Sequence, residues 1–418
     1  MSRLRNSYKW ELLLLLWIAY FLNQGDRQIY SAVLPLIKAD LKLSDVQLGL
    51  VATTFTLLYG VFVPLAGCLG DFVAKKWIVC LSLLTFSIGT LLTGISGGLI
   101  ALIVFRSVAT GVGESFYYPA ANSLIGHYHR DTRAQAMAIH QTSLYIGVVA
   151  SSWIAAWIGE QHGWRTTFYA FGSLGMLLAV IVAFRLRNEH RDAVVSEAVA
   201  PEPVKLREAL RTILKTPTLY FLSFAFGGMV FVSVGWITWM PTFLYEKFHM
   251  PLKDAALHAM LIHHIFAFLG VMVGGRVSDR MATRRRSIRL EIEILGLALG
   301  APFIWLIGAS PSLTIVYVAL AGFGLFRGLY DSNLFATLFD VIPLRYRSTA
   351  TGVMLSCAFT VGATSPMLLG YVKQHIDLGV GLSWLAIVYA LGAVILFVAL
   401  RKYFLRDYVE ENPSPRTV

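Results

Sequence analysis

The chain has 418 residues, of which 56% are hydrophobic and only 14% are charged. A soluble domain of this size cannot place so much apolar surface in water, so the composition indicates an integral membrane protein. The formal net charge of +11 does not point to nucleic acid, because the basic residues are spread over short loops between apolar segments.

Apolar segments of membrane-spanning length fill most of the chain. A hydrocarbon core about 30 Å thick requires roughly 20 helical residues, and by this measure the chain contains about twelve spans. They lie near residues 11–37, 46–70, 77–95, 97–126, 134–158, 166–186, 217–245, 255–276, 287–308, 312–340, 348–373 and 380–403. The first is interpreted as a span and not a signal peptide, because no small-residue cleavage site follows it. Because period-two alternation is missing, we predict an all-α protein and not a β-barrel.

The distribution of charge predicts both topology and domain organisation. Most of the 35 Lys and Arg residues lie at the termini and in the even-numbered loops, which the positive-inside rule places in the cytoplasm. Both termini of this multi-pass protein are therefore expected on the cytoplasmic side of the cytoplasmic (inner) membrane. A polar, proline-containing stretch separates the first six spans from the last six. We predict an N-terminal six-helix bundle at 1–186, a cytoplasmic linker at 187–216, a C-terminal six-helix bundle at 217–405 and a cytoplasmic tail at 406–418.

Two pairs of similar loops indicate an internal duplication. "GCLGDFVAKKW" follows the second span and "GRVSDRMATRRR" follows the eighth, each with a Gly, an Asp four residues later, and then basic residues. "RDTRAQAMAI" and "LRYRSTATGV" follow spans four and ten in the same way. Duplicated halves of a transporter build a central binding site at their interface, which is what this repeat predicts.

These features together resemble the Major Facilitator Superfamily over nearly the whole chain. The first loop matches that superfamily's signature between helices 2 and 3, and the second departs from it because Thr283 replaces the first basic residue. The resemblance implies two pseudo-symmetric six-helix bundles and a role for these loops in conformational change. The gating residues that it implies are Gly67, Asp71, Lys75, Lys76, Asp279, Arg284 and also Arg106 in helix 4.

Narrower similarities point to two groups within that superfamily. "YGVFVPLAGCLGD" and "GVGESFYYPAANSLI" resemble the spinster-type transporters. The Asp-Arg pair of "FLNQGDRQIYS", the acid of helix 4 and "WITWMPTFL" are also similar to the anion:cation symporters, which move sugar acids and other organic anions. Arg106 and Glu114 are one residue further apart than the corresponding pair in both groups. In both groups the acids of helices 1 and 4 are the proton-coupling pair.

The first span carries charges where the bilayer makes them unfavourable. Asn23, Asp26, Arg27 and Tyr30 are spaced i, i+3, i+4 and i+7, so they share one helical face that is expected to line a central cavity. Intramembrane ionisable residues are by default candidates for function. We interpret Asp26 as a proton-coupling residue and Arg27 as a group that binds an anion. The alternative is a structural ion pair, for example between Asp26 and an Arg of a neighbouring helix.

Helix 4 repeats this pattern. Arg106, Glu114 and Tyr117 follow a helical spacing, and Gly111 and Gly113 permit close approach of another helix. Glu114 is predicted to be the second proton-coupling carboxylate. Arg106 is equally compatible with a structural role and a coupling role.

The second half offers fewer candidates. Arg327 and Asp331 are one turn apart, so they either form a self-satisfied pair or leave Arg327 to bind an anionic substrate opposite Arg27. Trp239 either stacks on a ligand or packs in the bundle. Further predicted substrate-lining residues are Tyr59, Tyr117, Gln141, Asn333 and Thr360.

The sequence lacks a phosphate-binding loop, a Rossmann glycine pattern and any His or Cys cluster with metal-ligand spacing. We therefore expect no enzyme, no cofactor and no metal. The predicted function is secondary active transport by alternating access, as proton-coupled symport of a small organic anion such as a sugar acid. Helix 5 has no proline of the kind that marks drug and proton antiporters, which favours symport. The expected partners are the substrate, protons and membrane lipids, with the protein a monomer.

Two alternatives accompany this prediction. One is export or flipping of a lysolipid or sphingolipid-like amphiphile, as the spinster-like stretches imply. The other is a receptor built on a transporter fold, which normally has an added soluble domain, whereas the linker and the tail here are short.

Overall fold

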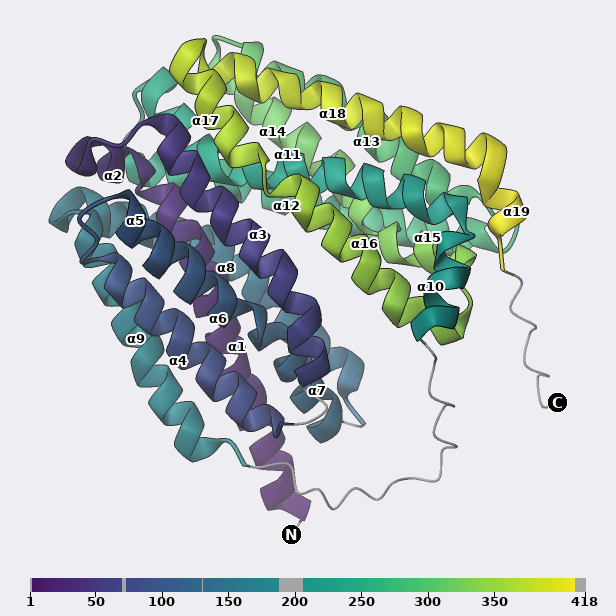
Figure 1. Ribbon diagram of the computed structural model, residues 1–418, viewed down its shortest axis with the longest axis horizontal. Helices are drawn as coiled ribbons and strands as arrows, with labels where there is room; N and C mark the ends of the chain where they lie inside the picture. Colours follow the sequence, from purple (N-terminus) through teal and green to yellow (C-terminus); the bar gives the residue numbers. More distant parts are fainter. Residues whose placement is uncertain (1, 70–72, 130, 188–205, 410–418) are drawn as a thin grey trace. The chain divides into compact units, whose positions relative to one another are not determined.

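A computed structural model describes residues 2–69, 73–129, 131–187 and 206–409 (Figure 1). In this part of the chain every regular element is a helix and no strand occurs. Eleven of the described helical segments are long and apolar enough to cross a membrane. The helix of the first predicted span is not one of them, because the polar run 23–28 lowers its hydropathy. The all-α membrane fold is thereby confirmed.

The helices of the first half follow the predicted spans closely. They are α1 (Ser2–Ala32), α2 (Leu34–Leu41), α3 (Asp45–Leu69), α4 (Lys75–Thr93), α5 (Leu99–Leu102), the π-helical segment η1 (Ile103–Thr110), α6 (Gly111–Ser115), α7 (Tyr117–Tyr128), α8 (Arg133–His162) and α9 (Trp164–Arg185). The predicted span 97–126 is thus one rod made of four helical segments.

The remaining helices belong to the second half of the chain. They are α10 (Leu206–Leu214), α11 (Pro217–Phe248), α12 (Leu252–Ala282), α13 (Ile288–Ala309), α14 (Leu313–Asp331), α15 (Leu334–Val341), η2 (Leu344–Tyr346), α16 (Arg347–Gly362), α17 (Ser365–His375), α18 (Leu378–Ala399), η3 (Leu400–Phe404) and α19 (Leu405–Asp407). Spans ten and eleven are each interrupted, between α14 and α15 and between α16 and α17.

Contacts divide the chain into two compact units. The first comprises Met1–Ser196, Ser233–His264 and Gly362–Gly381, and the second comprises Glu197–Val232, Ile265–Val361 and Leu382–Val418. The first unit therefore includes one part each of α11 and α12 and the whole of α17. The division into two six-helix bundles at the linker stays a prediction.

Helices of the first unit pack through small residues. α1 packs against α8, α4 against α9, and α3 against α17 (Figure 1). A Cβ at Gly172 of α9 would lie 2.6 Å from the backbone nitrogen of Leu91, and one at Gly370 of α17 would lie 2.3 Å from the carbonyl oxygen of Asp45. Backbones this close exclude any larger residue at either position.

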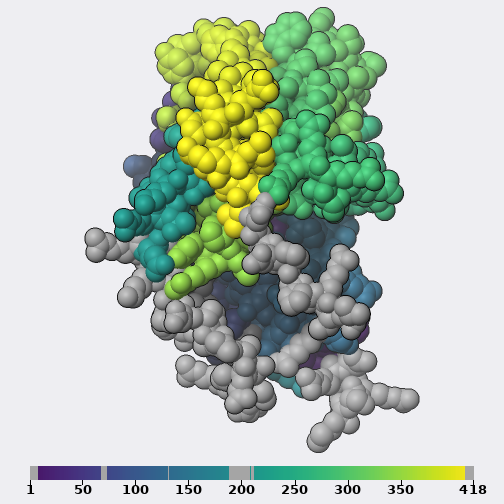
Figure 2. Space-filling model, turned by 90° about the vertical axis from the view of Figure 1, so that its right-hand side faces the viewer, coloured from purple at the N-terminus to yellow at the C-terminus, as the bar shows by residue number. Residues whose placement is uncertain are grey.

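In the second unit α13 has several helical neighbours. It packs against α14 and α15, and α18 covers it further along. Ser383 of α18 donates a hydrogen bond to the carbonyl oxygen of Trp305, at 3.1 Å, and Gly300 faces the ring of Tyr389. Figure 2 shows α18, in yellow, beside the green helices of the same unit.

Candidate functional site

The adjacent charges of α1 have different partners. Asp26 is 4% exposed, and its Oδ2 accepts a hydrogen bond from the hydroxyl of Thr90 on α4 at 2.8 Å. Arg27 instead donates from Nε to Oε2 of Glu114 on α6 at 2.7 Å. Neighbouring residues of a helix point about 100° apart, which is how one helix serves two polar partners. Among the described residues Asp26 forms no ion pair with an arginine, unlike in the structural alternative considered above.

Arg27 and Glu114 form an ion pair inside the first unit. The Glu114 side chain has no exposure and that of Arg27 is 24% exposed. The guanidinium carbon of Arg27 also lies 4.0 Å from the centre of the Tyr59 ring on α3. The carboxylate and the ring together hold the guanidinium in one place, while part of it stays accessible.

Arg106, on the π-helical segment η1, reaches the backbone of Arg27. Its Nη2 donates to the carbonyl oxygen of Arg27 at 3.4 Å, and its guanidinium carbon lies 4.3 Å from the centre of the Phe55 ring. A π-helix holds more residues per turn than an α-helix. Segment η1 therefore absorbs the extra residue between Arg106 and Glu114, and both side chains reach the same region.

The other predicted residues of the first half are mostly used in packing. Tyr30 donates to the carbonyl oxygen of Leu48 at 2.9 Å, and Tyr117 donates to that of Leu16. Asn23 is 2% exposed and accepts a hydrogen bond from the neighbouring Gln24 side chain. Gln141 is half-buried on α8. Asn23, Tyr30 and Tyr117 therefore bond within the first unit in this conformation, and their contact with substrate stays a prediction.

Trp239 is completely buried in the first unit. Its Nε1 donates to the carbonyl oxygen of Pro366 at 2.9 Å, and its ring faces the ammonium of Lys373 at 5.4 Å. Both its polar atom and its ring surface are occupied, so the packing interpretation describes this conformation. Its role in substrate binding stays a prediction.

The predicted residues of the second unit lie on α14, in the turn that follows it and on α16. Arg327 and Asp331 form an ion pair along α14, with Nε 3.4 Å from Oδ2. Asn333, at the interruption after α14, is buried and donates to the hydroxyl of Ser332 at 2.9 Å. Thr360 is exposed on α16 and donates to the carbonyl oxygen of Ser356. The pair does not distinguish the structural interpretation of Arg327 from the functional one.

Apart from Arg106, the predicted gating residues that the structure describes lie at or near helix ends. Lys75 and Lys76 begin α4, and Gly67 is near the end of α3. Asp279 and Arg284 are exposed around the end of α12. Asp71 lies outside the described residues.

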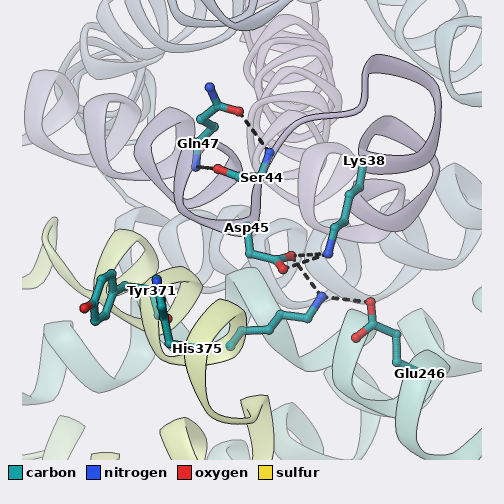
Figure 3. Close-up of polar contacts among 8 residues, drawn as sticks. Lys38, Ser44, Asp45, Gln47, Glu246, Tyr371 and His375 are labelled. Carbon is teal, nitrogen blue, oxygen red and sulfur yellow. Dashed lines mark hydrogen bonds and ion pairs between the residues drawn. The ribbon is translucent and has the colours of Figure 1, made fainter.

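Sequence reasoning missed a cluster of four charges in the first unit. Asp45 begins α3 and accepts hydrogen bonds from Lys38 at 2.7 Å and from Lys373 of α17 at 2.9 Å (Figure 3). Lys373 also donates to Glu246 of α11 at 2.8 Å. The only sequence signal was their place at the ends of predicted spans, where charged residues are common.

A buried acid of the second unit was missed as well. Glu293 lies on α13 with 0% exposure and accepts a hydrogen bond from Thr337 of α15. The signal was a second acid inside the span in "RLEIEILGL". No group of three or more His, Cys, Asp or Glu that could hold a metal occurs among the described residues.

The sequence also matches a known protein family. Residues 16–366 match the sequence pattern of the Major Facilitator Superfamily. The chain belongs to the Major Facilitator Superfamily. This family and the relatives below are transporters, which confirms the predicted resemblance and the prediction of a transporter rather than an enzyme.

Two relatives and one solved structure illustrate its place in this superfamily. The hexuronate transporter of Bacillus subtilis is 26% identical, over 93% of this chain and 94% of its own. Protein spinster homolog 1 of Xenopus laevis is 26% identical, over 91% of this chain and 76% of its own. A bacterial homologue of the human lysosomal transporter Spinster, in an inward-facing and unoccupied conformation, superposes with a TM-score of 0.86 at 22% identity, over 97% and 99% of the two chains. This last likeness concerns the fold alone.

Proposed function

We propose that this transporter is a proton-coupled symporter that takes up a small organic anion across the cytoplasmic membrane by alternating access. Asp26 and Glu114 exchange the proton, and Arg27, with Arg327 from the other half, binds the anion. The observation that carries the proposal is the 2.7 Å ion pair between Arg27 and Glu114, in which the side chain of Glu114 is completely buried.

The ion pair supplies a physical reason for coupling. The carboxylate of Glu114 and a carboxylate of the substrate would compete for the same guanidinium, whose planar donors suit either one. When Glu114 gains a proton it no longer neutralises Arg27, and the substrate anion then does so. Closure around a neutral site avoids an unpaired charge in an apolar interior, so protonation favours binding and occlusion of the anion.

Arg106 provides further support for an anion. Its Nε and Nη1 are buried and have no hydrogen-bond partner among the described residues, although Nη2 reaches the carbonyl oxygen of Arg27. A substrate oxygen would accept hydrogen bonds from these donors, whereas each buried donor that stays without a partner costs about 1–3 kcal/mol. The hexuronate transporter among the relatives favours a sugar acid.

The remaining parts of the proposal follow from charge and repeats. The loops that contain Asp71 and Asp279 would control the rocking of the two halves, with both termini in the cytoplasm and the protein acting as a monomer.

The test is uptake of radiolabelled hexuronate into proteoliposomes. An inward proton gradient should drive accumulation in the wild type, and Asp26→Asn should abolish it. Accumulation that is indifferent to the proton gradient would contradict the proton coupling.

The second candidate is export or flipping of a lysolipid or sphingolipid-like amphiphile, which the resemblance of "YGVFVPLAGCLGD" and "GVGESFYYPAANSLI" to the spinster-type transporters implies. The relative named spinster homolog 1 agrees with that resemblance. Saturable movement of a labelled lysolipid in the same vesicles, with no hexuronate uptake, would replace the first proposal by the second.

A further inference from the structure

Two glutamates two residues apart on α13 have opposite surroundings. Glu291 accepts a hydrogen bond from Ser287 at 2.6 Å and pairs with Arg285 at 2.9 Å, with its side chain 20% exposed. Glu293 is 0% exposed and lies on the face of α13 that packs into the second unit. The ordinary explanation for Glu291, a charge paired at the surface, does not extend to Glu293.

Within the described part of the chain Glu293 has a single polar partner. Thr337 of α15 donates to its Oε1, while its Oε2 has no hydrogen-bond partner in the described part of the chain. No Lys, Arg or His side chain of that part forms an ion pair with it. An ionised carboxylate normally accepts hydrogen bonds at both oxygens, so this environment is unsuited to a negative charge.

The charged and titratable groups around Glu293 do not compensate for a negative charge. Arg289, one turn earlier on α13, directs Nη1 to Oδ1 of Asp340 on α15 at 2.6 Å. From α14, Tyr330 contributes a buried hydroxyl that has no partner among the described residues. Asp340 adds negative charge and Arg289 is already neutralised by it. The surroundings therefore bring no net positive charge to Glu293.

Ionisation of a carboxyl group in such a place is strongly unfavourable, and the group avoids this by keeping its proton. We propose that Glu293 is a proton-binding site of the second unit, separate from Asp26 and Glu114, and that its bound proton keeps α15 packed on α13. The proposal rests on the surroundings of Glu293 alone. It stands or falls independently of the proposed substrate and of proton coupling in the first unit.

The position of the site gives the proton a structural consequence. The hydrogen bond from Thr337 joins α13 to α15 just after the interruption at Ser332 and Asn333 that separates α15 from α14. Loss of the proton would place a charge between α13 and α15 and draw water into their contact. Alkaline pH should therefore loosen α15 from α13.

Infrared spectroscopy of the reconstituted protein tests the bound proton directly. Protonated carboxylic acids show a carbonyl stretch that carboxylates lack. At neutral pH, the spectrum of the wild type minus that of Glu293→Gln should contain this band. The matched control Glu291→Gln, which removes a charged carboxylate from the same helix turn, should yield only carboxylate bands in its difference spectrum.

Thr337→Val adds a variant that keeps Glu293. Removal of the hydrogen bond should keep the same band but shift it to higher frequency, which a protonated carboxyl group elsewhere in the protein would not do. This measurement remains decisive if Glu293→Gln fails to fold. Carboxylate bands in the Glu293→Gln difference spectrum, or a Thr337→Val spectrum without such a shift, would overturn the proposal.

Thermal unfolding provides an independent readout. An acid that is neutral when buried and ionised when exposed releases a proton on unfolding, so rising pH favours unfolding. The apparent Tm of the wild type and of Glu291→Gln should fall from neutral to alkaline pH relative to that of Glu293→Gln. Identical pH dependence in all three proteins would contradict the site. Hexuronate uptake enters neither measurement, so failure here leaves the transport proposal untouched.

Discussion

The ammonium nitrogen of Lys373 lies 2.9 Å from Oδ1 of Asp45, although 328 residues separate the two in the sequence. Both side chains are only 8% exposed. This contact joins α17 to the start of α3, at the point where the backbone of Gly370 also approaches Asp45. Lys38 and Glu246 are the other two members of this charged cluster, so each charged group has a neighbour of opposite charge.

Lys373→Met should destabilise the protein strongly. The substitution leaves Asp45 with Lys38 alone and removes the cation from Glu246. Breaking a buried ion pair by removal of one partner typically costs about 3–5 kcal/mol. We expect a clear fall in the apparent Tm of the purified protein. Lys402→Met, which removes an exposed lysine, is the control and should leave the Tm almost unchanged.

A double-mutant cycle with Asp45→Asn tests whether the contact between Lys373 and Asp45 causes this loss of stability. In the double variant no buried carboxylate is left beside a missing ammonium, so its loss of stability should be smaller than the sum of the two single losses. Additive losses would mean that the two residues act separately.

Arg27→Lys should impair transport although the charge is kept. A lysine cannot reproduce the Nε contact to Glu114 or the stacking on Tyr59. Hydrogen bonds to charged groups contribute about 1.5–3 kcal/mol, which corresponds to roughly a 10- to 100-fold loss in the ratio of maximal rate to KM for hexuronate uptake. Arg401→Lys, at an exposed arginine, is the control. Normal uptake by Arg27→Lys would remove Arg27 from the anion site.

Glu114→Gln should separate binding from coupling. The amide resembles a permanently protonated carboxyl and leaves Arg27 available to the substrate. We expect exchange of labelled for unlabelled substrate to continue in proteoliposomes, while accumulation driven by a proton gradient is lost. If the variant still accumulates substrate as the wild type does, Glu114 is not a coupling residue.

Deletion of Val108 should be tolerated. Val108 is 42% exposed on η1, and removal of one residue from a π-helical turn converts it to an α-helical turn. Arg106 and Glu114 would then have the spacing of the resembled families and remain on one face. We expect a folded protein with measurable uptake, assessed by gel filtration and transport.

The matched control is deletion of Ile146, which is 48% exposed on the regular helix α8. That deletion rotates every later residue of α8 by about 100° relative to its packing partners and should abolish folding. Equal damage by both deletions would contradict the role assigned to η1.

The extent of sequence-based prediction differs between the fold and the site. The order of the helices, their approximate ends and the transporter family could all be predicted, because hydropathy and loop charge are properties of short segments. The polar residues of α1 and Glu114 were also found this way, since a charge inside an apolar segment is conspicuous.

The partners of those residues could not be predicted. That Arg27 contacts Glu114 and not Asp26, and that Asp26 contacts Thr90, depends on how α1 lies against α4 and α6. The extra residue before Glu114 was visible in the sequence, but its accommodation in a π-helical turn was not.

The same contrast applies to the charges that were overlooked. The order of residues alone is enough to place Asp45, Lys373 and Glu293 at or within membrane helices. Whether each is paired or isolated depends on packing between segments far apart in the chain, which brings Lys373 to Asp45 and leaves Glu293 with Thr337. The energy of a charge is set by its neighbours in space, and the hydropathy of a segment carries no information about those neighbours.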